Sequence, residues 1–558
     1  MEISKKILKH LNHFSIKNFF KNSLNYFSQF FFFISNQFRN FYLNSKIYNR
    51  KISKISNKSF EYKPSPSLLD CLIKYEKKEI KIEDLYLNSV WANENLFEKD
   101  YKNLHSFFWL FSLDLKSSKK ITQSIILNWI EDNINYNKKN WEIDILSKRI
   151  IAWISNSKLT YEDSEEFYKN KFNLIIQKQI NHLINAIEKS KWIDDKMIGC
   201  AAVILTGLSL NEKEKYLNFG FSLLKKIINF SFDNQGFPKS RNIQQLTFYL
   251  KYFVLIREWL KESQTEIPEY LDEIIFYLGN SYSILCQEKS KAILFNGNNE
   301  TDNKDFDQYL SNQGYKFKNN FFETGGYIIL KNKKVSLVMD VGLSPEKKFS
   351  KDYQFGALSF EITSNNKKLI CNSGYFQKIK HKLNNVSKSS ASHSALIIDN
   401  HSSCKINKSK MEVEIGLKIL KKSFVMEKNY WNICASHDGY TKRYGVIHER
   451  QIEFFLENSK FVGQDKLIKK KNFKNSNFEI RFHLEPTTKT MKTQDGKSIL
   501  IDIENEGWKF TAQGYTIDIE TGLYFGKKNS FTKNQNLFIS GITQKEDQII
   551  KWEFEKIS

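Results

Sequence analysis

The chain has 558 residues, of which 41% are hydrophobic and 15% aromatic, so it can bury more than one core. Its formal net charge of +23 attracts polyanions, although the Lys-, Asn-, Ile- and Phe-rich composition of the whole chain also accounts for this excess. No zinc finger, phosphate-binding loop or RNA-binding aromatic signature accompanies the lysines, so nucleic acid is excluded as the expected partner.

Residues 1–60 form a basic segment that is rich in aromatic residues. The run Phe30-Phe-Phe-Phe33-Ile34 is much shorter than the roughly 20 apolar residues that a membrane-spanning helix needs. No small-residue cleavage site of a signal peptide follows it. Two interpretations stay open: a helix packed on the protein body, and peripheral contact of a basic aromatic helix with a membrane surface.

Residues 61–295 are predicted to form a helical domain, because apolar residues recur there at helical spacing and Gly and Pro are rare. The clearest segments are Ile121–Ile134, Trp141–Ser155, Tyr168–Glu188, Ile198–Leu208 and Leu217–Phe230. This pattern is typical of stacked helix pairs.

Residues 321–558 are predicted to form an antiparallel β-sandwich, because short apolar runs alternate with polar residues. Examples are Tyr327–Leu330, Val335–Met339, Ala357–Ile362, Phe478–Leu484 and Ser498–Ile503. The intervening stretch 296–320 is rich in Asn, Asp, Gly and Lys and is the expected linker. The sequence therefore predicts a helical domain followed by a separate β domain.

Motifs in both halves of the chain resemble those of one enzyme family. The helical half contains Leu104-His-Ser-Phe-Phe-Trp109, Trp141-Glu-Ile-Asp-Ile-Leu-Ser-Lys-Arg149 and Asp233-Asn-Gln-Gly-Phe-Pro-Lys-Ser-Arg241-Asn242. The second half contains Ala391-Ser-His393-Ser-Ala-Leu-Ile-Ile-Asp399, His437-Asp-Gly-Tyr440 and Arg443-Tyr-Gly-Val-Ile-His-Glu-Arg450. In this order they resemble the heparinase II/III family from about Ser67 onward. The resemblance implies an incomplete (α/α) toroid, then an antiparallel β-sandwich, and β-elimination of an acidic polysaccharide.

The implied reaction sets the catalytic candidates. A polysaccharide lyase neutralises a uronate carboxylate, removes the proton on C5 and protonates the leaving glycosidic oxygen. The resemblance makes His393 a catalytic candidate, with a hydrogen-bonded structural histidine as the alternative. Tyr440 or Tyr444 could supply the phenol, with cross-strand packing as the alternative.

Five residues are candidates for substrate binding. Arg241 and Asn242 could hold a carboxylate, since a guanidinium binds one through two hydrogen bonds; a helix cap and an ion pair with a local acid are the alternative. Gln244 stands where the family has a tyrosine, and it cannot act as a base at neutral pH. His437 and Arg443, which flank a turn signal, complete this set.

By the same resemblance, the ligand positions of the metal-containing family lyases correspond here to Asp352, Gln354, Gly356, Asn372 and His393. Only His393 keeps the family identity, and amide oxygens are poor zinc ligands. No cofactor is therefore predicted, and a divalent cation held through Asp352 stays an alternative.

Two functions remain open on this basis. The first is a polysaccharide lyase-like enzyme of the periplasm or cell envelope, a location that only the resemblance implies. The second is a catalytically lapsed glycan-binding protein for assembly or export of an envelope polysaccharide. The substitutions at Gln244, Gln354 and Asn372 favour the second function.

Overall fold

The computed structural model describes residues 34–53, 60–65, 69, 91, 97–112, 119–210, 213–286, 292–300, 302–318, 322–378, 381–407, 412–527 and 529–558. Contacts divide the chain into two compact units. Unit 1 is Met1–Leu224 with Trp259–Thr265, and unit 2 is Lys225–Glu258 with Glu266–Ser558. The predicted domain boundaries at residues 60, 295 and 320 stay a prediction.

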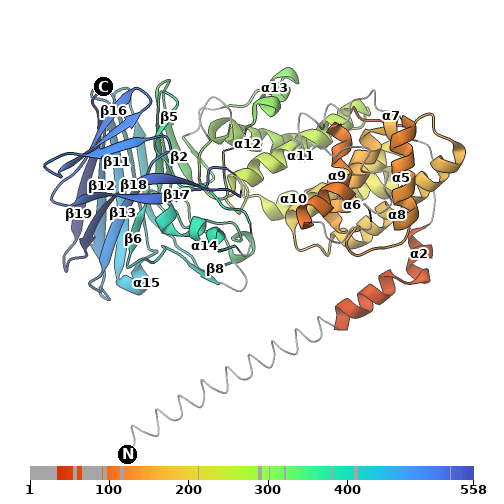
Figure 1. Ribbon diagram of the computed structural model, residues 1–558, viewed down its shortest axis with the longest axis horizontal. Coiled ribbons are helices and arrows are strands. Elements are labelled where there is room, and N and C mark those ends of the chain that lie inside the picture. Colours follow the sequence, from red (N-terminus) through yellow and green to blue (C-terminus); the bar gives the residue numbers. More distant parts are fainter. Residues whose placement is uncertain are drawn as a thin grey trace, which may run out of the picture. The chain divides into compact units, whose positions relative to one another are not determined.

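Unit 1 is helical in the part of the chain that the structure describes (Figure 1). After helical residues 34–43 its elements are α2 (Lys46–Ile52), α4 (Glu98–Ser106), η3 (Phe108–Ser112), α5 (Lys119–Asn133), α6 (Ile143–Ser155), α7 (Ser157–Thr160), α8 (Glu166–Ile187), α9 (Ile193–Ser209) and η4 (Lys213–Leu217). Helices α10 (Asn218–Ser231) and α11 (Ile243–Glu262) each contain residues of both units. Among the described residues, no helix combines the length and apolar character that crossing a bilayer requires.

A buried arginine ties the core of unit 1 together. Arg149 of α6 lies with its guanidinium 4.2 Å from the ring centre of Trp129. It donates hydrogen bonds to the backbone oxygens of His105 and Asn140, both at 2.9 Å, and to Gln179 at 3.2 Å. A buried cation needs such partners to offset its lost hydration. The Trp141–Arg149 motif therefore has a structural role in unit 1.

Unit 2 begins with helices and continues, in its described residues, into four antiparallel sheets. Its helices beyond α10 and α11 are α12 (Glu269–Leu285), α13 (Lys304–Asn312), α14 (Lys382–Lys388) and α15 (Thr441–Tyr444), with short turns η5 (Lys347–Phe349) and η6 (Ser390–Ser392). Helix α13 lies inside the stretch expected as a linker, and Asn296, Asn298 and Asn299 of that stretch are buried. Asn296 donates to Asp340, and Asn298 and Asn299 donate to the backbone oxygens of Ile293 and Tyr375, so the low apolar content of the stretch reflects polar packing.

The sheets hold the sandwich core. The five-stranded sheet runs in the order β1 (Glu323–Thr324), β2 (Tyr327–Lys331), β3 (Val335–Asp340), β4 (Phe360–Ser364), β5 (Lys367–Ile370). The eight-stranded sheet is ordered β14 (Lys489–Lys492), β15 (Ser498–Ile503), β16 (Glu506–Ala512), β19 (Gln548–Lys556), β12 (Lys460–Lys469), β11 (Val446–Phe455), β10 (Tyr430–His437), β9 (Ile419–Met426). The four-stranded sheet is ordered β17 (Ile517–Tyr524), β18 (Thr532–Ile542), β13 (Asn477–His483), β6 (Leu396–Ile398), and β7 (Lys405–Asn407) pairs with β8 (Glu412–Ile415).

Alternation along the strands builds this core. Strand β12 buries every second residue, as expected for a sheet with one face inward. The inward faces supply large aromatic rings, among them Phe454 stacked on Phe461 at 4.1 Å and Phe360 stacked on Trp552 at 5.4 Å. Burial of such rings supplies a large share of the stabilising free energy.

Candidate functional site

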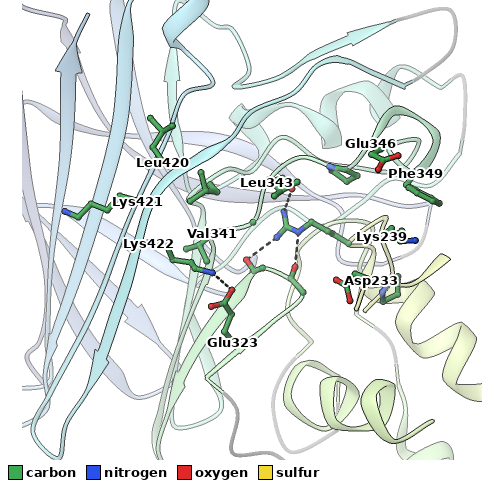
Figure 2. A pocket seen from close by; sticks show the side chains of 17 residues that line it. Asp233, Lys239, Glu323, Val341, Leu343, Glu346, Phe349, Leu420, Lys421 and Lys422 are labelled. Atoms are coloured by element: carbon green, nitrogen blue, oxygen red, sulfur yellow. Dashed lines mark hydrogen bonds and ion pairs between the residues drawn. The ribbon is translucent and has the colours of Figure 1, made fainter. Parts of the chain in front are cut away.

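Unit 2 contains a cavity of about 620 Å³ beside Arg241 (Figure 2). The loop that precedes α11, strand β1 with the turn after it, the loop that follows β3, and strand β9 line this cavity. Its size lies within the usual range of small-molecule pockets. Apolar lining comes from Leu343, Phe349 and Leu420, among others. Charged lining residues are Asp233, Lys239, Arg241, Glu323, Glu346, Lys421 and Lys422. The cavity therefore combines apolar side chains with charged ones, some buried and some exposed to solvent.

Arg241 forms the floor of this cavity and is only 7% exposed. Its Nη2 lies 2.6 Å from Asp340, and its Nε, Nη1 and Nη2 donate to the backbone oxygens of Gly325, Leu343 and Gly326. Burial lowers the pKa of Arg241, but Asp340 and nearby tyrosines outweigh it and raise the pKa above its usual value. Of these contacts, the one from Nη1 to Leu343 is the longest, at 3.4 Å.

The backbone at Arg241 is strained and supported. Its φ is +58°, a left-handed conformation that a residue with a Cβ adopts only at a cost. The phenol of Tyr327 donates to the Arg241 carbonyl at 2.8 Å, and the Arg241 N–H donates to Pro238 at 2.8 Å. Gly342 lets the guanidinium approach, since a Cβ there would lie 2.2 Å from its Cζ. The fold thus fixes this side chain in one place.

Asn242 and Gln244 begin helix α11. The Asn242 Oδ1 accepts from the backbone N–H groups of Gln244 and Gln245 at 2.9 and 3.2 Å, which is an N-cap. Gln244 belongs to an amide cluster, donating to Asn299 at 3.3 Å and accepting from Gln377 at 2.5 Å. These contacts are the structural alternative expected for Asn242, and the substrate-binding role of both residues stays a prediction.

His393 lies inside the sandwich and is 1% exposed. Neither ring nitrogen has a hydrogen-bond partner among the described residues, and the ring packs on Gly356, where a Cβ would lie 2.9 Å from the His393 Cγ. Burial, with a smaller contribution from His483, lowers the pKa of His393 to about 3. At neutral pH His393 is therefore neutral and shielded from solvent.

The positions that correspond to family metal ligands do not fit a metal. Gln354 accepts from the Gly297 N–H and donates to the carbonyls of Gly374 and Ser387. Asn372 accepts from the Ser394 N–H and donates to Glu361. Asp352 accepts from the phenol of Tyr375 at 2.8 Å. Their side chains are committed to protein groups, and the described residues contain no cluster of three His, Cys, Asp or Glu that could hold a metal ion.

The tyrosine candidates are likewise committed. Tyr440 is buried and donates to the Leu396 carbonyl at 2.8 Å, and burial raises the pKa of its phenol. The Tyr444 hydroxyl bonds to His401 Nδ1 at 2.7 Å. Arg443 is exposed and lies 5.6 Å from the Tyr444 ring centre. Of the predicted site residues, only Arg241 lines the cavity. The catalytic and substrate-binding roles of all of them stay predictions.

A polar network that the sequence analysis missed lies behind the His-Asp-Gly-Tyr turn. His437 Nδ1 accepts from the Gly439 N–H, so its Nε2 carries the proton and donates to His448 Nδ1 at 3.2 Å. His448 Nε2 then donates to Asp465 at 2.6 Å. Their position on paired strands β10, β11 and β12 could have suggested the contact, because cross-strand partners occupy the same face.

Asp465 is the centre of this network. It accepts from Arg450 Nε at 2.8 Å and Nη2 at 3.1 Å, and from the Trp552 indole at 2.8 Å. Burial raises the pKa of Asp465, but Arg450 and His448 outweigh it and hold the pKa below its usual range. Arg450 Nη1 also donates to the Leu358 and Ser394 carbonyls, at 2.9 and 2.8 Å. The network thus fixes the segment next to His393.

Comparison with known proteins places this β domain in a family. Residues 316–553 match the family described as Heparinase II/III-like, C-terminal. The chain carries a heparinase II/III-like C-terminal domain. The comparison with curated proteins gives no match.

Solved structures share the fold of this chain. A mutant of heparan sulfate lyase HepC from Pedobacter heparinus aligns with a TM-score of 0.68 at 12% identity, over 92% of this chain and 87% of that one. The Heparinase III-BT4657 gene product aligns with a TM-score of 0.66 at 14% identity, over 84% and 80%. A heparinase III aligns with a TM-score of 0.66 at 15% identity, over 87% and 78%. The predicted fold class, a helical toroid followed by an antiparallel sandwich, is confirmed.

Proposed function

We propose that this chain is a polysaccharide lyase-like protein that acts on an acidic, uronate-containing polysaccharide. The observation that carries the proposal is the heparinase II/III-like C-terminal domain within a fold shared with heparan sulfate and heparin lyases. Since a fold alone does not define chemistry, the cavity beside Arg241 provides the second line of support.

The charges of the cavity suit an anionic sugar. Lys422 points toward Glu323 across the cavity mouth and lies 2.5 Å from it, while both side chains remain partly exposed (Figure 2). Such an exposed pair contributes little free energy, so an incoming carboxylate or sulfate can take over the lysine. Lys239 also lines the cavity, 6.0 Å from the ring centre of Phe349, but its ammonium already donates to the backbone oxygens of Asn229 and Phe230 at 3.0 and 3.1 Å. Apolar sugar faces would contact Leu343, Phe349 and Leu420.

The proposed reaction is β-elimination. A cation at the uronate carboxylate makes the C5 proton more acidic, a base removes that proton, and an acid protonates the leaving oxygen. Arg241 or Lys422 would meet the carboxylate in the cavity. His393 stays the candidate for proton transfer, and it must become accessible for this role because it is 1% exposed.

A second candidate function is glycan binding without cleavage, in assembly or export of an envelope polysaccharide. One observation favours it: His393, Tyr440 and Tyr444 are all buried, and none lines the cavity that contains Arg241. Gln244, in the family's tyrosine position, bonds to other amides. Under both candidates the proposed location is the periplasm or cell envelope, which fractionation of cells expressing the chain would test.

Ultraviolet absorbance separates the two functions. β-Elimination forms a conjugated unsaturated uronate, so incubation with heparan sulfate, alginate and native envelope glycan is expected to raise absorbance if the lyase proposal holds. His393→Ala should abolish the rise while circular dichroism confirms that the variant is folded. Binding without any rise would replace the lyase proposal by the binding function. Absence of both binding and absorbance change would contradict both.

A further inference from the structure

The described N-terminal residues of unit 1 expose large apolar side chains. Phe38, Phe41 and Ile47 are 72%, 79% and 73% exposed, and Tyr42 is 42% exposed. They lie on helical residues 34–43 and on α2 (Figure 1). Isolated exposed apolar residues are ordinary, but four within ten residues of chain require an explanation. Phe38, Phe41 and Tyr42 stand at positions i, i+3 and i+4 of one helical segment and so share a face.

Helix α2 is anchored, so the exposure of Ile47 does not result from a detached helix. Tyr48 and Ile52, one turn apart, are buried against unit 1. The Tyr48 hydroxyl bonds to His182 Nδ1 at 2.8 Å, and Asn181 donates to the Ile52 carbonyl at 2.9 Å. Because one face of α2 is fixed in this way, Ile47 is directed to solvent.

The charge around these apolar residues has one sign. Arg39, Lys46, Arg50 and Lys51 are exposed, and residues 34–53 contain no acidic residue. Residues 1–58 contain eleven Lys and Arg residues against a single acid, Glu2. Exposed aromatic side chains interspersed with cations fit the interface of an anionic bilayer, where rings enter the headgroup region and cations meet lipid phosphates.

We propose that this N-terminal aromatic surface, made of Phe38, Phe41, Tyr42 and Ile47 with Arg39, Lys46, Arg50 and Lys51, docks on the headgroup region of an anionic lipid membrane. The proposal goes beyond polysaccharide recognition and does not depend on it. A second copy of the chain is a poorer occupant, since it carries the same basic surface and a net charge of +23. Charge complementarity therefore favours the lipid.

Vesicle co-sedimentation of the full chain tests the proposal. The wild type is expected to sediment with phosphatidylcholine vesicles that contain phosphatidylglycerol, and to bind them at least tenfold more strongly than pure phosphatidylcholine vesicles. Higher salt should weaken this binding, because it screens the charges. Phe38→Ser with Phe41→Ser should lower the partition coefficient at least tenfold, since two aromatic side chains lose their burial in lipid. Arg39→Gln with Lys46→Gln should lower it roughly 30-fold, at about fivefold for each charge.

The matched control is Phe97→Ser, which removes an 83% exposed Phe of the same unit that precedes the acidic first turn of α4. This control should bind like the wild type. The proposal is overturned if the wild type does not bind the anionic vesicles, or if the Phe38/Phe41 variant binds as well as the control. The proposal is also overturned if light scattering shows that the wild type self-associates and that the Phe38/Phe41 variant differs from it only by being monomeric. If the Phe38/Phe41 variant unfolds, the Arg39/Lys46 variant replaces it. The proposal is then overturned if the Arg39/Lys46 variant binds the anionic vesicles as well as the control does.

Discussion

Asp465→Asn is expected to destabilise the β domain by about 3–5 kcal/mol, because it leaves Arg450 buried without its counter-charge. Both side chains are fully buried, and Asp465 accepts from His448 and Trp552 as well. Urea unfolding, followed by tryptophan fluorescence, measures the change, since Trp431, Trp508 and Trp552 are buried in the sandwich core.

Asp518→Asn is the matched control for this variant. Asp518 pairs with Lys492 at 2.7 Å, but their side chains are 49% and 38% exposed. Loss of such a pair should cost less than about 1 kcal/mol. An Asp465→Asn variant as stable as the control would mean that the buried network contributes little, which the geometry contradicts.

Acidification below pH 6.5 is expected to destabilise the protein steeply. Six histidines are buried in the part of the chain that the structure describes: His105, His182, His393, His437, His448 and His483. Burial lowers the pKa of each; the pKa values of His105, His393 and His483 fall to about 3 and that of His182 to about 4. Burial also lowers the pKa of His437 and His448, although Asp465 partly opposes it at His448.

The sign follows from proton uptake by the unfolded chain. An unfolded histidine binds a proton near pH 6.5, whereas these folded histidines stay neutral to a lower pH. The stability is therefore complete above pH 6.5 and falls as the pH drops toward the folded values, by about 1.4 kcal/mol per pH unit for each histidine. His393→Leu should make the dependence shallower by one such increment, measured as the free energy of unfolding at pH 7, 6 and 5. An unchanged slope would mean that His393 is protonated equally in both states.

Regular elements of this chain could be predicted because periodicity follows burial. Strand β15 coincides with the predicted run Ser498–Ile503, and α6 with the end of the predicted segment Trp141–Ser155. Strand β4 begins at Phe360, three residues after the predicted start at Ala357. The Gly356 and Ala357 residues belong to a turn whose N–H at Ser359 bonds to the Gly356 carbonyl, a local contact that apolar alternation does not report.

The candidate site was harder to predict because its contacts are far apart in sequence. Arg241 was identified from its motif, but its partner Asp340 lies 99 residues away on another element. The same separation hid Lys422 and Glu323, also 99 residues apart, which close the cavity. His393 was identified by resemblance, and its burial depends on packing against Gly356 that no local pattern contains. Motifs thus locate residues, while the fold decides which of them meet a ligand.

Calorimetric titration with heparan sulfate oligosaccharides measures whether the cavity beside Arg241 binds an acidic polysaccharide. Arg241 itself is unsuitable for substitution, since its loss would leave Asp340 buried and unpaired. Lys422→Gln is the informative variant. Lys421→Gln is the matched control, because it removes the same charge one residue away. Lys421 also lines the cavity, but its side chain points away from Glu323 and Lys422 (Figure 2) and pairs with Glu449 at 3.2 Å.

The proposal predicts that the wild type binds and that Lys422→Gln weakens Kd about tenfold, as expected for one charge-assisted hydrogen bond. Lys421→Gln should change Kd less than twofold, since it removes only a long-range attraction of the ligand that salt screens. Equal weakening of binding by both variants would mean that the polysaccharide is attracted by the net positive charge of the protein and not by the cavity. Absence of binding by the wild type would contradict the claim outright.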